Sequence, residues 1–149
     1  MPAVFVHGVP DTPQLWRPLI ESLVRKDVVT LALPGFNCAL PEGFDSSKEA
    51  YAAWIVTQLE DIGAPVDLVA HDWGSALAFH WAKRFPDRVR ALVYMEAIVR
   101  PMAWEEWPEA ARSIFQTMRS SAGEEVVLRK NVFVERILPA SVLRRLTDE

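Results

Sequence analysis

Asp72 is the residue of this sequence whose type and setting best suit covalent chemistry. An apolar run that begins at Val66 leads into Ala70-His71-Asp72-Trp73-Gly74, and a helical pattern follows directly. Small residues at 70 and 74 bracket the turn, as in the strand-to-helix motif G-x-S-x-G that raises a nucleophile above a sheet. A carboxylate at its tip can displace a leaving group from a saturated carbon and form an ester, whereas a serine would indicate acyl transfer.

A second interpretation of Asp72 stays open at this point. Aspartate is favoured at the N-cap of a helix, where its side chain accepts hydrogen bonds from the free N–H groups. His7, which ends another apolar run, is an isolated histidine, and such a residue is more often a hydrogen-bonded structural group than a base. We therefore do not assign His7 to catalysis.

Composition limits the class of protein. The chain has 149 residues, half of them apolar, and a formal charge of −4 without a basic run, so it fits one globular domain and nucleic acid is not an expected partner. Cys38 is the only cysteine, which excludes an internal disulfide and is compatible with the cytoplasm, the location we expect. No apolar run approaches the ~20 residues that span a bilayer, and we expect neither a signal peptide nor a membrane anchor.

The elements that must position Asp72 alternate between strands and helices. Strands are predicted over 3–7, 28–33, the run before Asp72 and 89–96. Helices are predicted from residues 11–12 to 23, from Ser46–Ser47 to a stop at Gly63, and over 74–84. This order is typical of an α/β fold with a parallel sheet and crossover helices.

Two helical stripes are predicted to pack into the core. Their members recur three or four residues apart and are Leu15, Trp16, Leu19, Ile20 and Leu23 in the first helix, and Tyr51, Trp54, Ile55, Leu59 and Ile62 in the second. The chain beyond Arg100 contains no clear strand and is predicted to be helical over 105–118 and 141–146.

Three stretches together resemble a known family. They are His7-Gly8-Val9-Pro10, His71-Asp72-Trp73-Gly74, and Tyr94-Met95-Glu96 followed by Trp104-Glu105-Glu106-Trp107-Pro108. The chain resembles the α/β-hydrolases, and most closely the haloalkane dehalogenases. The resemblance implies an α/β-hydrolase fold with a partial sheet, in which residues 1–96 are the N-terminal part of the core and residues 97–149 are the beginning of a helical cap.

The resemblance also implies roles for four residues. Asp72 is the expected nucleophile, which attacks the halogen-bearing carbon to give an alkyl-enzyme ester. Trp73 is expected to hold the departing halide through its indole N–H, and the backbone N–H groups of Val9 and Trp73 form the expected oxyanion hole. Glu96 matches the acid that orients a catalytic histidine in one branch of the dehalogenases. A surface carboxylate at a strand end is the alternative interpretation of Glu96, and the less favoured one, since the carboxyl end of a parallel strand is where α/β sites form. The expected substrate is a small haloalkane, with water, and neither a metal nor a cofactor is expected.

The sequence departs from the family pattern in two respects. Val9 stands where many dehalogenases have an asparagine whose amide supplies a second donor to the halide, and losing such a donor costs ~1–3 kcal/mol. None of His7, His71 and His80 matches the family's late catalytic histidine, and His71 is expected to point toward the core. We therefore expect the N-terminal half of a dehalogenase, truncated at both ends, which forms the ester without hydrolysing it and exposes an unpaired sheet edge.

Three different functions also remain open from the sequence. An epoxide hydrolase uses the same turn but needs cap tyrosines, and Tyr51 and Tyr94 both lie outside the predicted cap. A coelenterazine-type luciferase resembles the dehalogenases closely, including the segment around Trp107. The third possibility is a non-catalytic fragment that retains the turn as inherited structure. Substrate chain length, halide preference and oligomeric state are not determined by these residues.

Overall fold

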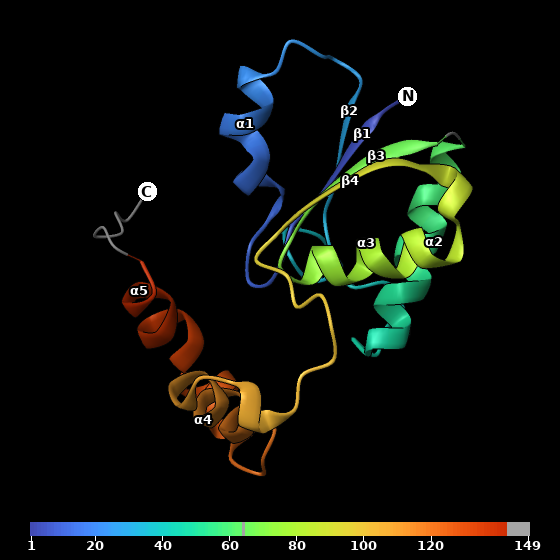
Figure 1. Cartoon of the computed structure of the whole chain (residues 1–149). Coiled ribbons are helices and arrows are strands. Elements are labelled where there is room, and N and C mark those ends of the chain that lie inside the picture. The colour runs from blue at the N-terminus through green and yellow to red at the C-terminus, as the bar shows by residue number, and fades with distance from the viewer. Residues whose placement is uncertain (64, 143–149) are drawn as a thin grey trace. The chain divides into compact units, whose positions relative to one another are not determined.

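The computed structural model describes residues 1–63 and 65–142, which divide into two compact units, Met1–Val99 and the residues from Arg100 onward (Figure 1). No helix among the described residues is long and apolar enough to cross a membrane.

The first unit is built on a four-stranded parallel sheet. Its strands are β1 (Ala3–Val6), β2 (Val28–Leu31), β3 (Val66–His71) and β4 (Val89–Met95), in the order β2-β1-β3-β4. Val6 lies beside Ala70 in the register of β1 and β3, and Ala70 lies beside Tyr94 in that of β3 and β4. All four carboxyl ends therefore meet at one edge of the sheet, where the predicted site residues lie. The predicted α/β class, the alternation of strands and helices along the chain and the parallel sheet are confirmed.

Helices cover both faces of this sheet (Figure 1). The 3-10 helix η1 (Pro13–Trp16) and α1 (Arg17–Ser22) lie on one face, and α2 (Lys48–Ile62) and α3 (Trp73–Arg84) lie on the other, with the short 3-10 helix η2 (Pro86–Arg88) before β4. The bounds of α2 follow from its caps, as predicted. The Ser47 hydroxyl accepts a hydrogen bond from Ala50 N–H at 3.1 Å, and Gly63 ends the helix with a φ of 73°.

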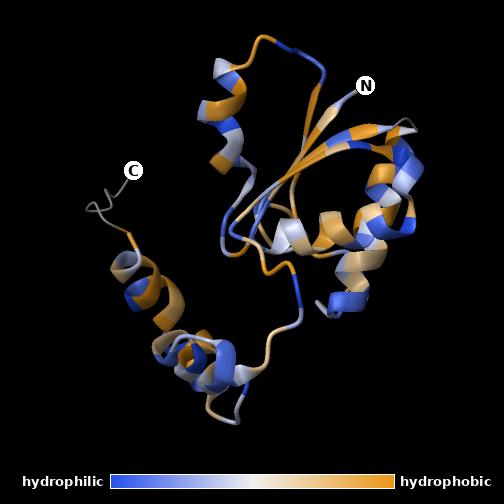
Figure 2. Cartoon of the chain, in the orientation of Figure 1, coloured by the Kyte–Doolittle hydropathy of each residue, from blue (hydrophilic) through white to orange (hydrophobic). Residues whose placement is uncertain are grey.

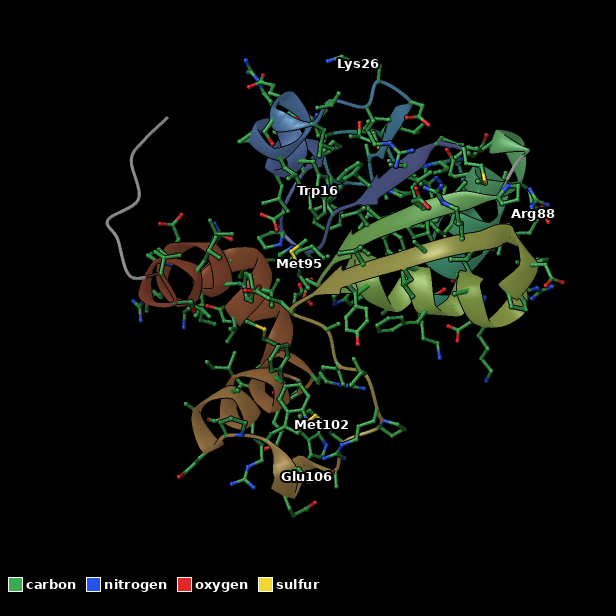
Figure 3. All side chains as sticks on the ribbon, turned by 45° about the horizontal axis from the view of Figure 1, so that its top comes forward. Trp16, Lys26, Arg88, Met95, Met102 and Glu106 are labelled. Carbon is green, nitrogen blue, oxygen red and sulfur yellow. The ribbon has the colours of Figure 1, made fainter. Side chains whose placement is uncertain are left out.

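Two apolar clusters bind these layers together. The larger packs Val4, Val6, Leu68 and Ala70 of the sheet against α2 and α3, and the smaller packs Ala3 and Phe5 against Trp16. Alternate residues of β1 thus face opposite clusters, as the two-residue period of a strand requires. Trp16 is labelled in Figure 3, and Figure 2 shows the strands coloured mostly as apolar.

The first predicted core stripe is only partly correct. Trp16 is buried and Ile20 and Leu23 pack beside it, whereas Leu15 and Leu19 are exposed. Trp16, Ile20 and Leu23 are spaced by four and three residues and share one helical face. Leu15 and Leu19 precede that face by one residue, which turns their side chains about 100° away from the sheet. In α2 the stripe is confirmed, since Tyr51, Ile55 and Leu59 are buried and Trp54 and Ile62 pack against the same cluster.

A buried charge holds the opposite end of the sheet. Asp67 of β3 is buried and accepts hydrogen bonds from Arg90 and from Arg25, whose Nη1 lies 2.9 Å from Asp67 Oδ2. These bonds, from Arg90 first, hold the pKa of the Asp67 carboxyl below its ordinary value. The cluster joins β3, β4 and the loop before β2 and is structural.

The outer strand β4 leaves apolar side chains uncovered. Val93, Tyr94 and Met95 are exposed, and among the described residues β4 pairs with β3 alone. Met95, labelled in Figure 3, ends the strand. The unpaired edge expected from the sequence is therefore present.

The second unit is helical as far as it is described. Its elements are the 3-10 helix η3 (Trp104–Glu106), α4 (Glu109–Met118), the π-helical turns η4 (Glu125–Arg129) and η5 (Phe133–Ile137), and α5 (Leu138–Ala140). The single helix predicted over 105–118 is interrupted, because Pro108 cannot continue the preceding turn and instead stands at the N-cap of α4. Of the helix predicted over 141–146, Ser141 and Val142 are not helical and the remainder lies outside the described residues.

The turns η4 and η5 were not predicted. In η4 the Lys130 N–H donates to Glu125 O at 3.0 Å, a bond that spans five residues. A search for a period of 3.6 residues does not find this spacing.

Candidate active site

The backbone of Asp72 adopts the conformation of a sharp strand-to-helix turn. Its φ is 49° and its ψ is −119°, in a region that non-glycine residues seldom occupy. The Asp72 N–H donates to Met95 O at 3.0 Å, and the Ser75 N–H donates to Asp72 O at 2.9 Å. Bonds to β4 on one side and to α3 on the other hold the strained residue in place.

The carboxylate of Asp72 does not cap α3. Asp72 stands at the N-cap position, yet its side chain accepts no hydrogen bond from that helix. Asp72 Oδ2 instead accepts the backbone N–H of Val9 at 3.0 Å. The N-cap interpretation is therefore wrong, and the side chain is turned toward the loop that follows β1.

Two glycines make room for this arrangement. A Cβ atom on Gly8 would lie 2.4 Å from Asp72 Cβ, and one on Gly74 would lie 2.3 Å from Val6 O. Both distances are shorter than any van der Waals contact permits, so the loop after β1 and the start of α3 can pass the turn at Asp72 only because Gly8 and Gly74 lack side chains. Gly74 was singled out in the sequence as a small residue of the turn, whereas Gly8 was named only as part of the stretch His7-Gly8-Val9-Pro10.

Trp73 begins α3 directly after Asp72. Its N–H is one of the amides at a helix start that lack a partner within the helix. The Trp73 side chain is 47 % exposed, and its ring meets Tyr51 edge-on with centroids 6.0 Å apart. The indole is thus beside the carboxylate in sequence and open to solvent.

His7 is engaged at both ring nitrogens. Nε2 accepts the Leu33 N–H at 3.0 Å, which leaves Nδ1 protonated and donating to Gly8 O at 2.8 Å. Burial lowers the pKa of His7 below its ordinary value, so the neutral ring is the folded form. These contacts agree with a structural role: His7 fixes the Gly8 loop against the end of β2.

His71 does not point toward the core, contrary to the expectation from the sequence. Its Nε2 lies 3.0 Å from Glu96 Oε2, and its Nδ1 lies 3.4 Å from Asp11 Oδ2. Along β3, Val66, Leu68 and Ala70 face α2 and α3. The two-residue period of the strand therefore turns His71 to the other face of the sheet, the face on which Trp16 packs. Glu96 was expected to orient a histidine that these 149 residues do not contain. In the structure it is paired with His71 instead.

Glu96 follows β4 with a φ of 51°, a second strained residue at the same sheet edge. Its side chain is 79 % exposed. Asp11, at the predicted start of the first helix, makes no capping bond to η1. Among the described residues no group of histidine, cysteine and carboxylate side chains is arranged to hold a metal ion.

Comparison with known proteins gives the family. A model described as alpha/beta hydrolase fold matches residues 2–144. This chain belongs to the alpha/beta hydrolase fold family. The α/β-hydrolase architecture expected from the resemblance is confirmed.

The relatives of this hydrolase-fold chain include haloalkane dehalogenases. It is 42 % identical to one from Sphingobium indicum strain UT26S, over 99 % of this chain and 52 % of the relative, and 38 % identical to one from Mycolicibacterium smegmatis, over 98 % of this chain and 49 % of the relative. The crystal structure of a haloalkane dehalogenase from Bradyrhizobium elkani USDA94 matches with a TM-score of 0.89 at 35 % identity, covering 99 % of this chain and 52 % of that one. The structure of a putative ancestral haloalkane dehalogenase matches with a TM-score of 0.86 at 39 % identity, covering 99 % and 53 %.

The hydrolase-fold chain thus spans about half the length of the curated relatives that it matches. Asp72 and the Val9 N–H lie within hydrogen-bond distance, and Glu96 is joined to the same edge through His71. The sequence did not single out Asp11 or His71 as site residues. The alternation along β3 was the available signal for His71.

Proposed function

We propose that this chain performs the first half of a haloalkane dehalogenase reaction, the alkylation of Asp72. The observation that carries the proposal is the Val9 N–H bond to Asp72 Oδ2, which fixes the carboxylate outside its helix. With Oδ2 held there, Oδ1 is the oxygen free to attack a halogen-bearing carbon. The new C–O bond forms as the carbon–halogen bond breaks, and the electron pair of that bond leaves with the halide.

Trp73 supports the departing halide in this proposal. Its indole N–H is a neutral donor whose hydrogen bond strengthens as negative charge develops on the halogen. Since the ring is 47 % exposed, water competes for the anion and weakens that advantage. Val9 supplies a backbone donor but no side-chain amide, so we expect slow displacement.

Hydrolysis of the ester would need a water molecule whose proton is taken by a base. The tetrahedral oxyanion would lie between the Val9 and Trp73 N–H groups, which are the donors available at the turn. Both ring nitrogens of His7 are hydrogen-bonded, and His71 Nδ1 is buried opposite Asp11. His80, the remaining histidine, is exposed on α3, two turns beyond Asp72. We infer that the alkyl ester accumulates.

The helical unit that begins at Arg100 is proposed to be the start of the cap. Support comes from the two compact units and from the change from alternating strands and helices to helices alone. We propose that the accepted length of the substrate depends on this segment. A small haloalkane is the substrate class we propose, with water for any later step.

The proposal is tested with 1-bromobutane. The purified chain is incubated with the haloalkane, and intact mass and released bromide are measured together. One butyl group and one bromide per chain, with no further bromide, is the expected result, and Asp72→Asn is expected to give neither. If the folded chain yields no adduct and no bromide, it is a non-catalytic fragment.

Neither an epoxide hydrolase nor a coelenterazine-type luciferase is favoured by a specific contact among the described residues. The Tyr51 hydroxyl donates to Pro34 O at 2.7 Å, and Tyr94 packs its ring on Phe79 with centroids 5.0 Å apart. Neither contact favours protonation of an epoxide oxygen above Asp72.

A further inference from the structure

The His71 imidazole lies between carboxylates that come from two other parts of the fold. Nε2 is 3.0 Å from Glu96 Oε2 after β4, and Nδ1 is 3.4 Å from Asp11 Oδ2 in the loop after β1. His71 itself ends β3 and directly precedes the proposed nucleophile. One ring therefore joins three adjacent strand ends at the edge where Asp72 lies.

The two contacts are not equivalent. A neutral imidazole carries one N–H, and only the Nε2 contact with Glu96 meets hydrogen-bond geometry. Nδ1 has no hydrogen-bond partner and is shielded from solvent. In the neutral ring the proton therefore lies on Nε2, which donates it to Glu96. The shielded Nδ1 has no access to the water that a catalytic base would activate.

The Glu96 turn needs such support. Its φ of 51° is costly for a residue with a side chain, and that side chain is otherwise exposed. The preceding residue is tied by its backbone, because Met95 O accepts the Asp72 N–H at 3.0 Å and the Ser75 hydroxyl at 3.3 Å. The bond from His71 adds a tie at the carboxylate, so the backbone and the side chain of this turn are both held to the strand of Asp72.

We propose that His71 is the positioning residue for Glu96: its Nε2–H holds Glu96 Oε2 and fixes the carboxylate beside the turn of Asp72. The inference rests on the proposed function, in which Asp72 of the adjoining turn is the nucleophile. Asp11 lies on the other side of the ring, with Oδ2 3.4 Å from Nδ1 and without a hydrogen bond to it. Asp72 and Glu96 are thereby connected through His71, the last residue of β3.

The test uses the ring protons of the intact chain, which contains three histidines. Long-range ¹H–¹⁵N correlation identifies which nitrogen of a neutral ring carries the proton. We expect His71 in the Nε2–H form and His7 in the Nδ1–H form, so that His7 serves as an internal reference. An Nδ1–H form of neutral His71, or a ring unaffected by Glu96→Ala, would overturn the proposal.

A second measurement separates positioning from general stability. Hydrogen exchange of the Asp72 amide reports on its bond to Met95 O. We expect this exchange to accelerate about five-fold in His71→Ala, to return to the wild-type rate in His71→Gln, whose amide can donate to Glu96, and to be unchanged in the exposed control His80→Ala. Equal exchange rates in His71→Gln and His71→Ala would contradict the proposal. If His71→Ala does not fold, the ring measurement on the unaltered chain tests the proposal in its place.

The butyl adduct distinguishes this inference from the proposed function. Alkylation of Asp72 does not require Glu96, so adduct formation is measured on the unaltered chain, alongside its ring protons. An Nδ1–H ring with the adduct intact overturns the positioning role alone. An Nε2–H ring without any adduct overturns the proposed function and leaves the pairing as a structural contact.

Discussion

The backbone N–H of Val9 donates to Asp72 Oδ2 at 3.0 Å and joins two residues that lie 63 positions apart. The bond crosses from the loop after β1 to the turn after β3. It depends on Gly8, because a side chain there would overlap the carboxylate. One amide thus fixes the orientation of the proposed nucleophile and remains beside it as a donor for the later oxyanion.

A side-chain donor at position 9 is expected to accelerate halide displacement. Val9→Asn adds an amide near the departing halide, and we expect the rate of adduct formation from 1-bromobutane to rise about five-fold, a modest gain because the neighbouring Trp73 is exposed. The rate is followed by intact mass. Val9→Leu, which changes the side chain without adding a donor, is the matched control and should react at the original rate. Equal rates for the two variants would exclude the second-donor explanation.

Gly74 is expected to tolerate no side chain. In Gly74→Ala the new Cβ would overlap Val6 O and His7 O, and we expect a loss of about 3 kcal/mol or more in the free energy of unfolding. Urea denaturation followed by circular dichroism measures the change. Gly43→Ala is the control, since its Cβ would meet nothing and only its φ of 71° carries a cost, about 1 kcal/mol. Similar losses in both variants would argue against the close approach.

The Asp67 cluster is expected to stabilise the chain in a pH-dependent manner. The pKa of Asp67 is lowered from 3.8, so its contribution is complete above that value and is lost as the pH falls through the lower folded pKa. We expect Asp67→Asn to cost about 2 kcal/mol at pH 7, because Arg90 and Arg25 lose a buried partner. The difference from the unaltered chain should shrink below pH 4, which urea denaturation at several pH values would measure. Exposed Asp87→Asn should change little, and a difference independent of pH would contradict this assignment.

The uncovered edge at β4 is expected to promote self-association. Val93 is 52 % exposed on an unpaired outer strand, where a charged side chain opposes strand addition. Val93→Lys should shift the chain toward monomer in sedimentation velocity. Val24→Lys, at an exposed loop position, is the control. Association that is unchanged in Val93→Lys would place the contact elsewhere.

Much of the fold could be predicted because its signals are local. Ser47 and Gly63 bound α2 through their own side chain and backbone, and the apolar runs around Val4 and Leu68 form strands on steric and hydrophobic grounds. The turn at Asp72 was likewise visible in its small neighbours. Leu15 and Leu19 were misassigned because spacing alone does not tell which of two adjacent helical faces meets the sheet.

The contacts of the site were harder to predict from the sequence because they join distant parts of the chain. The Val9–Asp72 bond follows from the register of β1 and β3, and the His71–Glu96 pair follows from that of β3 and β4. Neither register can be obtained from one strand. His71 was expected to face the core because it precedes the tip of the turn, yet the two-residue alternation of β3 turns it the other way.

The most direct test of Asp72 as the nucleophile is the mass of the intact chain after exposure to 1-bromobutane. A single butyl adduct that maps to Asp72, matched by one equivalent of bromide and missing in Asp72→Asn, is the predicted result. Asp72→Asn must retain the unfolding midpoint of the unaltered chain for the comparison to hold. An unmodified mass with no bromide from the folded chain, or an adduct that persists in Asp72→Asn, would contradict the assignment of Asp72 as the nucleophile.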